Sequence, residues 1–166
     1  MSTKNLDNQE AITKLKELAE SIDFAMLCTD LGATPFHAIP MSTKKVDDQG
    51  HIWFLSGQDS SHNQNIQREA KVEVLYANSG TMQFLSVFGE AAIRKEPAIL
   101  KELYQSTDNS WFSGVDDPSL TAIEVAPLEA HYWDVKGNKL TALLKLGWGG
   151  LTGERPDYAR QGDLKV

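Results

Sequence analysis

Three short segments carry the residues whose types and order suit binding chemistry. They are Ile39-Pro40-Met41-Ser42, Trp53-Phe54-Leu55-Ser56 and, shortly after the second, the polar turn Ser60-Ser61-His62-Asn63. Aromatic and apolar surface beside hydroxyl, imidazole and amide groups suits a flat ring with a phosphate tail. The same residues also fit an ordinary strand pair followed by a solvated turn, and their spacing alone favours that plainer interpretation.

Motifs for other chemistry are absent from the sequence. The four histidines, at positions 37, 51, 62 and 131, lack the spacing of zinc-binding motifs, so we expect no metal site. There is no G-x-S-x-G nucleophile elbow, no P-loop and no G-x-G-x-x-G turn after a strand. Cys28 lies within an apolar stretch, which predicts an inert buried thiol rather than a nucleophile. The sequence therefore offers almost no catalytic side chains.

Length and composition predict one soluble domain. The chain has 166 residues, a common size for a single domain, and its one cysteine excludes an internal disulfide. The 16 basic residues are outnumbered by 23 acidic ones, and the formal charge of −7 argues against binding to nucleic acid. No segment approaches the roughly 20 apolar residues of a membrane span, and the N-terminus lacks the apolar core of a signal peptide. We therefore expect a cytoplasmic protein that binds neither nucleic acid nor membranes.

The elements that would position these side chains follow from hydrophobic periodicity. Ile12, Leu15, Leu18, Ala19 and Ile22 recur at helical spacing, and Asp7 or Asn8 is in place to cap that helix. Strand-like alternation follows at residues 23–29, 36–44, 52–56, 72–77, 82–93, 120–125 and 130–135, and shorter helices are predicted at 60–69 and 97–105. Short strands joined by Gly and Asp turns are typical of an antiparallel β-barrel or sandwich.

Glycine and proline refine the predicted strands. Pro40 cannot donate to a strand ladder, so it predicts an edge, a bulge or a gap that faces a ligand. Pairing of its strand with residues 52–56 through the Val46–Gly50 turn would bring the ends of both strands beside the polar turn at 60–63. Gly89 interrupts the longest strand, which suits a bulge or a sharp bend, and Pro127 separates the last two strands.

Taken in order, these motifs resemble the pyridoxamine 5'-phosphate oxidase-like split barrels that bind FMN, and among them the bacterial general stress proteins. The series continues beyond the first three segments with Val87-Phe88-Gly89-Glu90-Ala91, Trp111-Phe112, Gly114, Asp117-Pro118, Val125, Pro127 and Ala130-His131-Tyr132-Trp133-Asp134. Each motif is weak alone, whereas the ordered series across residues 10–135 is fairly specific.

The resemblance implies a mainly β protein with flanking helices (α+β), built on a six-stranded antiparallel split β-barrel. It also implies a homodimer with flavin at its interface, FMN in the first place and FAD as a second option. The residues implied at the flavin are Ile39, Pro40, Met41, Trp53, Phe54, Leu55, Ser56, Ser61, His62 and Trp133. Residues 1–136 would form this domain. Residues 137–166 would form a partly disordered tail packed on the body or the partner, with Leu140–Leu146 and Trp148 covering the dimer or the pocket.

Two positions depart from the family pattern. The resemblance places Ile39 where the family usually has an arginine at the flavin, and His62 where it usually has a lysine at the phosphate. Each lost charged hydrogen bond contributes about 1.5–3 kcal/mol. The candidates to compensate for this loss are Ser61, Asn63, Thr43, Lys44 and Arg68. Loose flavin binding, a different ligand and loss of the cofactor are open alternatives.

These expectations lead to two hypotheses of different class. The first is a general-stress-type, FMN-dependent oxidoreductase, in which the flavin carries the electrons and the protein binds and tunes it. The second is a dimeric stress-response module that binds flavin or another flat anion without turnover. A pyridoxamine 5'-phosphate oxidase proper is disfavoured, because its substrate phosphate needs a basic cluster and only Lys44-Lys45 and Arg94-Lys95 are adjacent basic pairs near strand ends.

Overall fold

A computed structural model describes residues 2–135 and 159–166 of the chain. The helices are α1 (Asn8–Ile22), α2 (Ser61–Arg68) and α3 (Pro97–Leu103), with a 3-10 turn, η1, at Ser106–Ser110. The longer strands are β3 (Phe24–Thr29), β4 (His37–Ser42), β6 (Ile52–Gly57), β7 (Lys71–Asn78), β8 (Gln83–Arg94), β9 (Leu120–Val135) and β10 (Ala159–Lys165). Two-residue strands are β1 (Ser2–Thr3), β2 (Leu6–Asp7) and β5 (Lys45–Val46).

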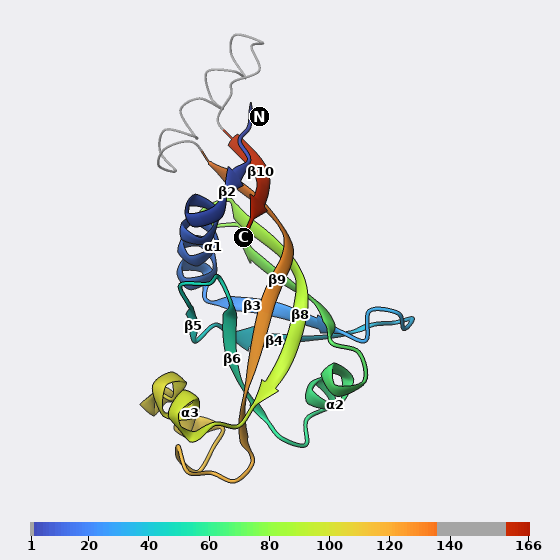
Figure 1. Ribbon diagram of the computed structural model, residues 1–166, viewed down its shortest axis with the longest axis vertical. Coiled ribbons are helices and arrows are strands. Elements are labelled where there is room, and N and C mark those ends of the chain that lie inside the picture. The colour runs from blue at the N-terminus through green and yellow to red at the C-terminus, as the bar shows by residue number, and fades with distance from the viewer. Residues whose placement is uncertain (1, 136–158) are drawn as a thin grey trace.

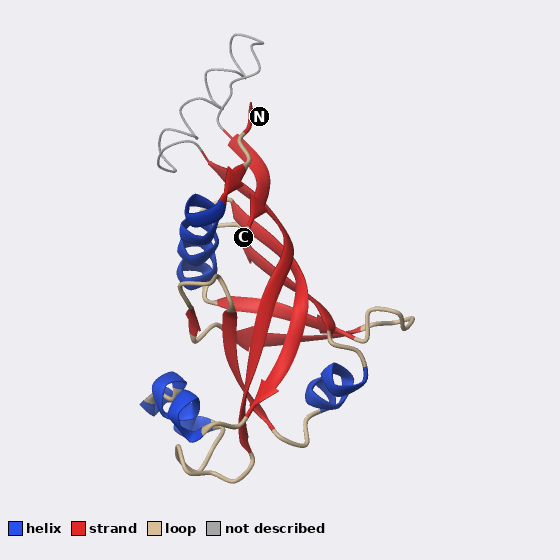
Figure 2. Cartoon of the chain, in the orientation of Figure 1, coloured by secondary structure: helices blue, strands red, loops and turns tan. Residues whose placement is uncertain are grey.

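The strands form one mainly antiparallel sheet, and the helices lie at its periphery (Figure 2). Its main path runs β1-β10-β9-β8-β7-β3-β4, while β6 pairs with β9, and β5 with β6. The prediction of a mainly β, α+β fold is confirmed. The count of six strands is not, because β10 and three two-residue strands bring the sheet of the described residues to ten. The predicted contacts of Leu140–Leu146 and Trp148 lie outside the described residues.

The two longest strands, β8 and β9, run side by side along the molecule (Figure 1). The prediction that Pro127 separates two strands is wrong, because β9 continues through it. Pro127 lies opposite Gly89, where the register shifts between Phe88 and Gly89, as the predicted bulge requires. A proline is tolerated at such an irregularity because no ladder hydrogen bond is required of its nitrogen.

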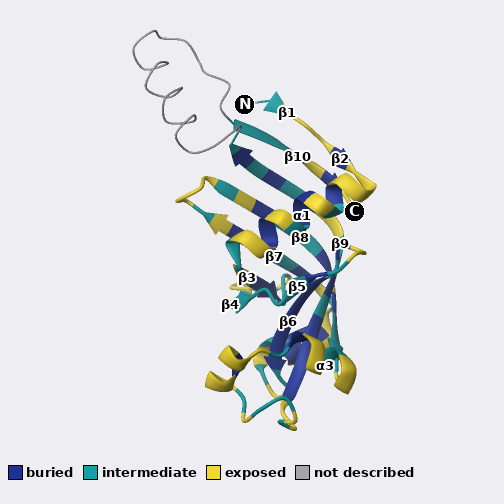
Figure 3. Cartoon of the chain, turned by 90° about the vertical axis from the view of Figure 1, so that its left-hand side faces the viewer, coloured by how far each residue is buried: buried dark blue, intermediate teal, exposed yellow. Residues whose placement is uncertain are grey.

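The hydrophobic core fills the space between α1 and the curved sheet. Leu15, Leu18 and Ala19 are buried on α1, as the helical spacing predicts, and Ala11 is buried with them, whereas Ile12 and Ile22 are half-buried. Along β6 and the adjoining half of β9 nearly every residue is buried (Figure 3). Cys28 is buried as well, and burial, together with Glu73, raises the pKa of its thiol. This environment fits the predicted inert thiol.

The path from β4 to β6 differs from the prediction. The expected pairing of these two strands is replaced by pairing of β5 with β6, in which Lys45 faces Trp53 and Val46 faces Ile52. Strand β4 pairs with β3 and forms an end of the sheet path, which explains how Pro40 is accommodated. Residues of both β4 and β6 line one cavity.

The bulge at Gly89 yields a first testable prediction. A Cβ atom at this position would collide with the backbone oxygen of Ala126, which cannot swing away as a side chain would. We expect Gly89→Ala to lower the free energy of unfolding by about 1–3 kcal/mol in urea denaturation. Gly32→Ala is the matched control, because a Cβ there meets no atom within 4 Å. Equal stability of the two variants would contradict this account of the bulge.

Candidate functional site

A cavity of about 440 Å³ lies between β4, β6, the start of α2 and the segment around η1. Its volume falls within the range of small-molecule sites. The lining residues are Phe24, Ile39, Pro40, Met41, Ser42, Lys44, Leu55, Ser56, Gly57, His62, Thr107, Asp108, Trp111 and Phe112. Most of this wall is apolar, and its polar side chains are Ser42, Lys44, Ser56, His62, Thr107 and Asp108.

Six of the ten residues predicted at the ligand line this cavity. They are Ile39, Pro40, Met41, Leu55, Ser56 and His62. Ser61, which precedes His62 in α2, does not line the cavity, and its hydroxyl is 3.4 Å from Nε2 of His37.

The other three predicted residues lie elsewhere. Phe54 is fully buried in the main core, and Trp53 packs with the cluster under α3 and donates its indole N–H to Asp47. Trp133 lies near the far end of β9, paired with Phe84 and close to the ring of His131.

A buried polar network fixes the start of α2 to the sheet. The hydroxyl of Ser56 donates to Oδ1 of Asn63 at 2.9 Å, and Nδ2 of Asn63 donates to Oγ1 of Thr121 and to the carbonyl of Gly57, both at 3.0 Å. All three side chains are almost completely buried. Because every member has a partner, the network holds α2 in one position.

The first turn of α2 adjoins the cavity, because His62 lies in that turn and lines the cavity. Ser60 caps the helix by accepting from the amide of Asn63. Helix geometry leaves the amides of Ser61 and His62 without an intrahelical acceptor. Such an end carries partial positive charge and favours an anion.

Two imidazoles beside this helix end have buried nitrogens without a hydrogen-bond partner among the described residues, Nε2 of His62 and Nδ1 of His37. Burial, and secondarily the neighbouring His37, lowers the pKa of His62. The imidazole of His62 is therefore mostly neutral near pH 7. His37 was missed by the sequence analysis, because nothing in the sequence relates the start of β4 to the polar turn at 60–63.

The residues expected to compensate for the missing arginine and lysine are mostly engaged elsewhere. Thr43 contacts the hydroxyl of Tyr76, Asn63 belongs to the buried network, and Arg68 binds Asn65. Lys44 pairs with Asp108 at 2.5 Å, with both side chains largely buried. Ser61 is therefore the candidate with no such commitment beyond its 3.4 Å contact with His37.

The Lys44–Asp108 pair also attaches η1 to the cavity wall. The second oxygen of Asp108 accepts from the amide of Gln105 as part of a capping box. Trp111, 84% exposed, and Phe112 follow directly and line the cavity. The pair thereby places two aromatic residues at the cavity. The positive charge of Lys44 is balanced by the Asp108 carboxylate and is not available to a ligand.

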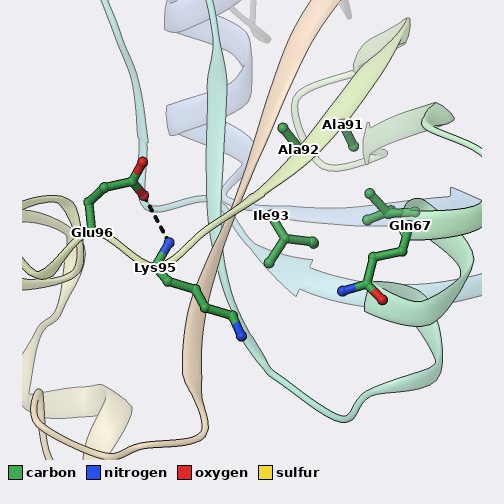
Figure 4. Close-up of a pocket in the computed structure, with 7 residues that line it drawn as sticks. Gln67, Ala91, Ala92, Ile93, Lys95 and Glu96 are labelled. Carbon is green, nitrogen blue, oxygen red and sulfur yellow. Dashed lines mark hydrogen bonds between the residues drawn. The ribbon is translucent and has the colours of Figure 1, made fainter.

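A second hollow, of about 640 Å³, lies between α2 and the end of β8 (Figure 4). Ala91, Ala92, Ile93, Lys95 and Glu96 are among the residues that line it. None of its lining residues is aromatic or carries an unpartnered buried nitrogen, whereas Trp111, Phe112 and His62 line the first cavity. The first cavity is therefore the better candidate for a ligand site.

The family model described as "Pyridoxamine 5'-phosphate oxidase like" matches residues 10–157. The chain belongs to this family, which confirms the resemblance seen in the sequence. A search of curated proteins finds no match. No helix among the described residues has the length and apolar character needed to cross a membrane.

Solved structures of the same fold agree with this assignment. A protein described as general stress protein 26 from Jannaschia sp. CCS1 superimposes with a TM-score of 0.78 at 19% identity, over 95% of this chain and 99% of that one. A general stress FMN/FAD binding protein from Xanthomonas citri superimposes with a TM-score of 0.65 at 24% identity, over 77% of this chain and 90% of that one. A general stress family protein from Xanthomonas campestris pv. campestris superimposes with a TM-score of 0.66 at 25% identity, over 80% of this chain and 92% of that one.

The buried Lys44–Asp108 pair generates a stability prediction. Lys44→Met leaves the Asp108 carboxylate buried without its cation, so we expect a loss of about 3 kcal/mol in urea denaturation at pH 7. Lys45→Met is the control. The Lys45–Glu102 pair is exposed, and its loss should change stability by less than about 1 kcal/mol. A Lys44→Met variant as stable as Lys45→Met would show that the wall does not depend on this pair.

Proposed function

We propose that this protein binds a flavin mononucleotide or dinucleotide as a general-stress-type member of its family and acts as an oxidoreductase through that flavin. The observation that carries the proposal is that one cavity joins an apolar wall to the N-terminus of a helix. Met41, Leu55 and Phe112 offer surface to a flat ring, while the amides of Ser61 and His62 suit a phosphate. The protein from Xanthomonas citri, which shares the fold, is described as FMN/FAD binding.

The unpartnered nitrogens support the position of the phosphate. Buried polar groups in proteins are nearly always hydrogen-bonded, so Nε2 of His62 and Nδ1 of His37 are candidates to face a ligand. In the proposed complex His62 contacts the phosphate, with Ser61 beside it, and Ile39 lies against the ring in place of an arginine. Trp53 and Phe54 act behind this wall through packing.

The bound flavin supplies the hydride or electron transfer, and the protein's residues bind and orient it. Ser56 and Asn63 hold α2 in register with β6, so the phosphate-binding amides keep a fixed distance from the apolar wall. Trp111 and Phe112 line the cavity on the η1 side and would shield a bound ring there.

A homodimer is part of the proposal, because an apolar sheet face adjoins the cavity. Strand register places Met26, Leu75, Phe84 and Trp133 on one face of β3, β7, β8 and β9. The exposed fractions of Met26, Leu75 and Phe84 are 40%, 41% and 36%. Phe24, 63% exposed, shares this face and also lines the cavity. A second copy seated on this face would cover the cavity mouth, and Trp133 would act at that interface.

The alternative is a dimeric module that binds flavin without turnover. It is favoured by the neutral cavity, in which Lys44 is paired with Asp108 and the lowered pKa of His62 removes its charge. The same neutrality disfavours a pyridoxamine 5'-phosphate oxidase proper, which needs a cationic site for a second phosphate. Reduction of the bound flavin by NADH or NADPH, followed at 450 nm, separates enzyme from binding module.

Titration with FMN, followed by flavin fluorescence, tests the position of the phosphate. Adding a charge with His62→Lys should tighten FMN binding about tenfold at pH 7.5. Riboflavin, which has no phosphate, is the matched control and should bind both proteins equally. An unchanged FMN affinity would place the phosphate elsewhere.

The pH dependence of the same titration follows from the lowered pKa of His62. A phosphate favours the protonated imidazole, so His62 has a higher pKa in the complex than in the free protein, and binding takes up a proton. FMN affinity should therefore rise as the pH falls from 8 to 6.5. The dependence should be lost in His62→Lys, whose charge is constant over this range. A parent protein with pH-independent affinity would show that His62 does not face the phosphate.

The apolar face gives a separate prediction for assembly. Leu75→Glu places a charge in the centre of the proposed interface, so we expect a shift from dimer to monomer in light scattering after gel filtration. Gln67→Glu adds the same charge on the exposed side of α2 and should leave the dimer intact. If Leu75→Glu and Gln67→Glu had the same molar mass in light scattering, that result would contradict this interface.

A further inference from the structure

A cluster of potential metal ligands lies outside the proposed flavin site, where the turn between β5 and β6 meets β9. Nδ1 of His51 is 2.7 Å from Oε1 of Glu124 and 3.8 Å from Oδ2 of Asp47. One ligand atom from each residue lies within 4.8 Å of the other two. Strand pairing of Trp53 with Glu124 brings β9 to the turn that carries Asp47 and His51.

Both carboxylates of this cluster are held in place by neighbouring donors. Oδ1 of Asp47 accepts from the amides of Gln49 and His51, and its Oδ2 accepts from the Trp53 indole, all at 2.9 Å. Arg94 donates to Oε2 of Glu124 at 2.7 Å, which leaves Oε1 facing His51. Such contacts behind the ligands orient them in metal sites and raise affinity.

The charge around the cluster favours a cation. A cavity of about 460 Å³ opens over it, and four carboxylates line that cavity, from Asp47, Asp48, Glu96 and Glu124, against the single guanidinium of Arg94.

We propose that Asp47, His51 and Glu124 form a binding site for a divalent first-row transition-metal ion such as Zn²⁺. Zinc binds imidazole nitrogen and carboxylate oxygen at about 2.0–2.2 Å, which puts ligand atoms of a tetrahedral site roughly 3.3–3.6 Å apart. The distances of 2.7 and 3.8 Å bracket that spacing, so small side-chain movements close the site. The ion would clamp the β5–β6 turn to β9, with water as its remaining ligand.

The sequence alone indicated only part of this metal-binding site. Asp47 and His51 are four residues apart, but across a turn rather than on a helix, and Glu124 comes from a distant strand. The expectation that the chain has no metal site rested on spacing along the sequence alone. The proposed site does not depend on flavin binding.

Isothermal titration of the untagged, chelator-treated protein with ZnCl₂ tests the proposal. We expect one ion per chain, and affinity weakened more than tenfold in His51→Gln and in Asp47→Asn. The asparagine variant keeps an oxygen to accept from the turn amides, but it loses the charge and the acceptor for the Trp53 indole, so its thermal unfolding is compared with that of the parent. MgCl₂ should not compete, because an imidazole-containing ligand set disfavours magnesium.

His131→Gln is the matched control. Nδ1 of His131 lies 2.6 Å from Asp163, a comparable histidine–carboxylate pair, but it is not part of such a three-ligand group among the described residues. This variant should bind zinc as the parent does. Absence of saturable binding in the parent would overturn the proposal, as would equal affinity in folded Asp47→Asn. Loss of binding in His131→Gln would assign the ion to another site and overturn it as well.

Discussion

The pairing of β9 along both edges is the constraint on which the rest of the structure depends. Its first half pairs with β6, its second half with β10, and β8 runs along the opposite edge. The change of partner falls between Val125 and Ala130, the stretch in which Pro127 meets Gly89 at an irregularity of the β8–β9 ladder. Thr121 of the network beneath the cavity, Glu124 of the proposed metal site and Trp133 of the apolar face are all placed by this one strand.

The neutrality of the candidate flavin site determines what it can recognise. Because Lys44 is paired with Asp108, an entering anion meets imidazoles and backbone amides rather than a free cation. The amides are neutral donors, and protonation of His62 on binding costs free energy near pH 7, so burial of the ring must supply a larger share of the affinity. Met41, Leu55 and Phe112 then matter more to binding than they would beside an arginine and a lysine.

Most elements of the fold were predictable from local patterns, whereas connections between distant segments were not. Alternation of Phe24, Met26 and Cys28 against Ala25 and Leu27 predicted β3, although Cys28 is buried and Phe24 and Met26 are exposed. Periodicity carries no information on which strand becomes the neighbour of which, so the role of β5 was missed. The prediction that Pro127 ends a strand was wrong for a related reason. Whether a strand can continue through a proline depends on its cross-strand partner, here Gly89.

In the candidate site, too, residues in one sequence segment could be predicted, whereas contacts between distant segments could not. Ile39, Pro40 and Met41 were found because they are adjacent in the sequence and lie on an edge strand. Trp53 and Leu55 share one face of β6, but Leu55 reaches the cavity while Trp53 points to Asp47. Asp108 and His37 were missed because their roles arise only from contacts with Lys44 and Ser61, which lie far away in the sequence.

The position of Phe24 links ligand binding to assembly in the proposed function. This side chain lines the cavity and also belongs to the apolar sheet face, so one partner surface would cover both at once. A ligand held in the cavity would then be buried more completely in the dimer than in the monomer. Binding free energy gained in one state shifts the equilibrium towards that state, and the coupling is reciprocal. Flavin binding and dimerisation would therefore reinforce each other, which offers a physical route by which a cavity without a free cation retains its ligand.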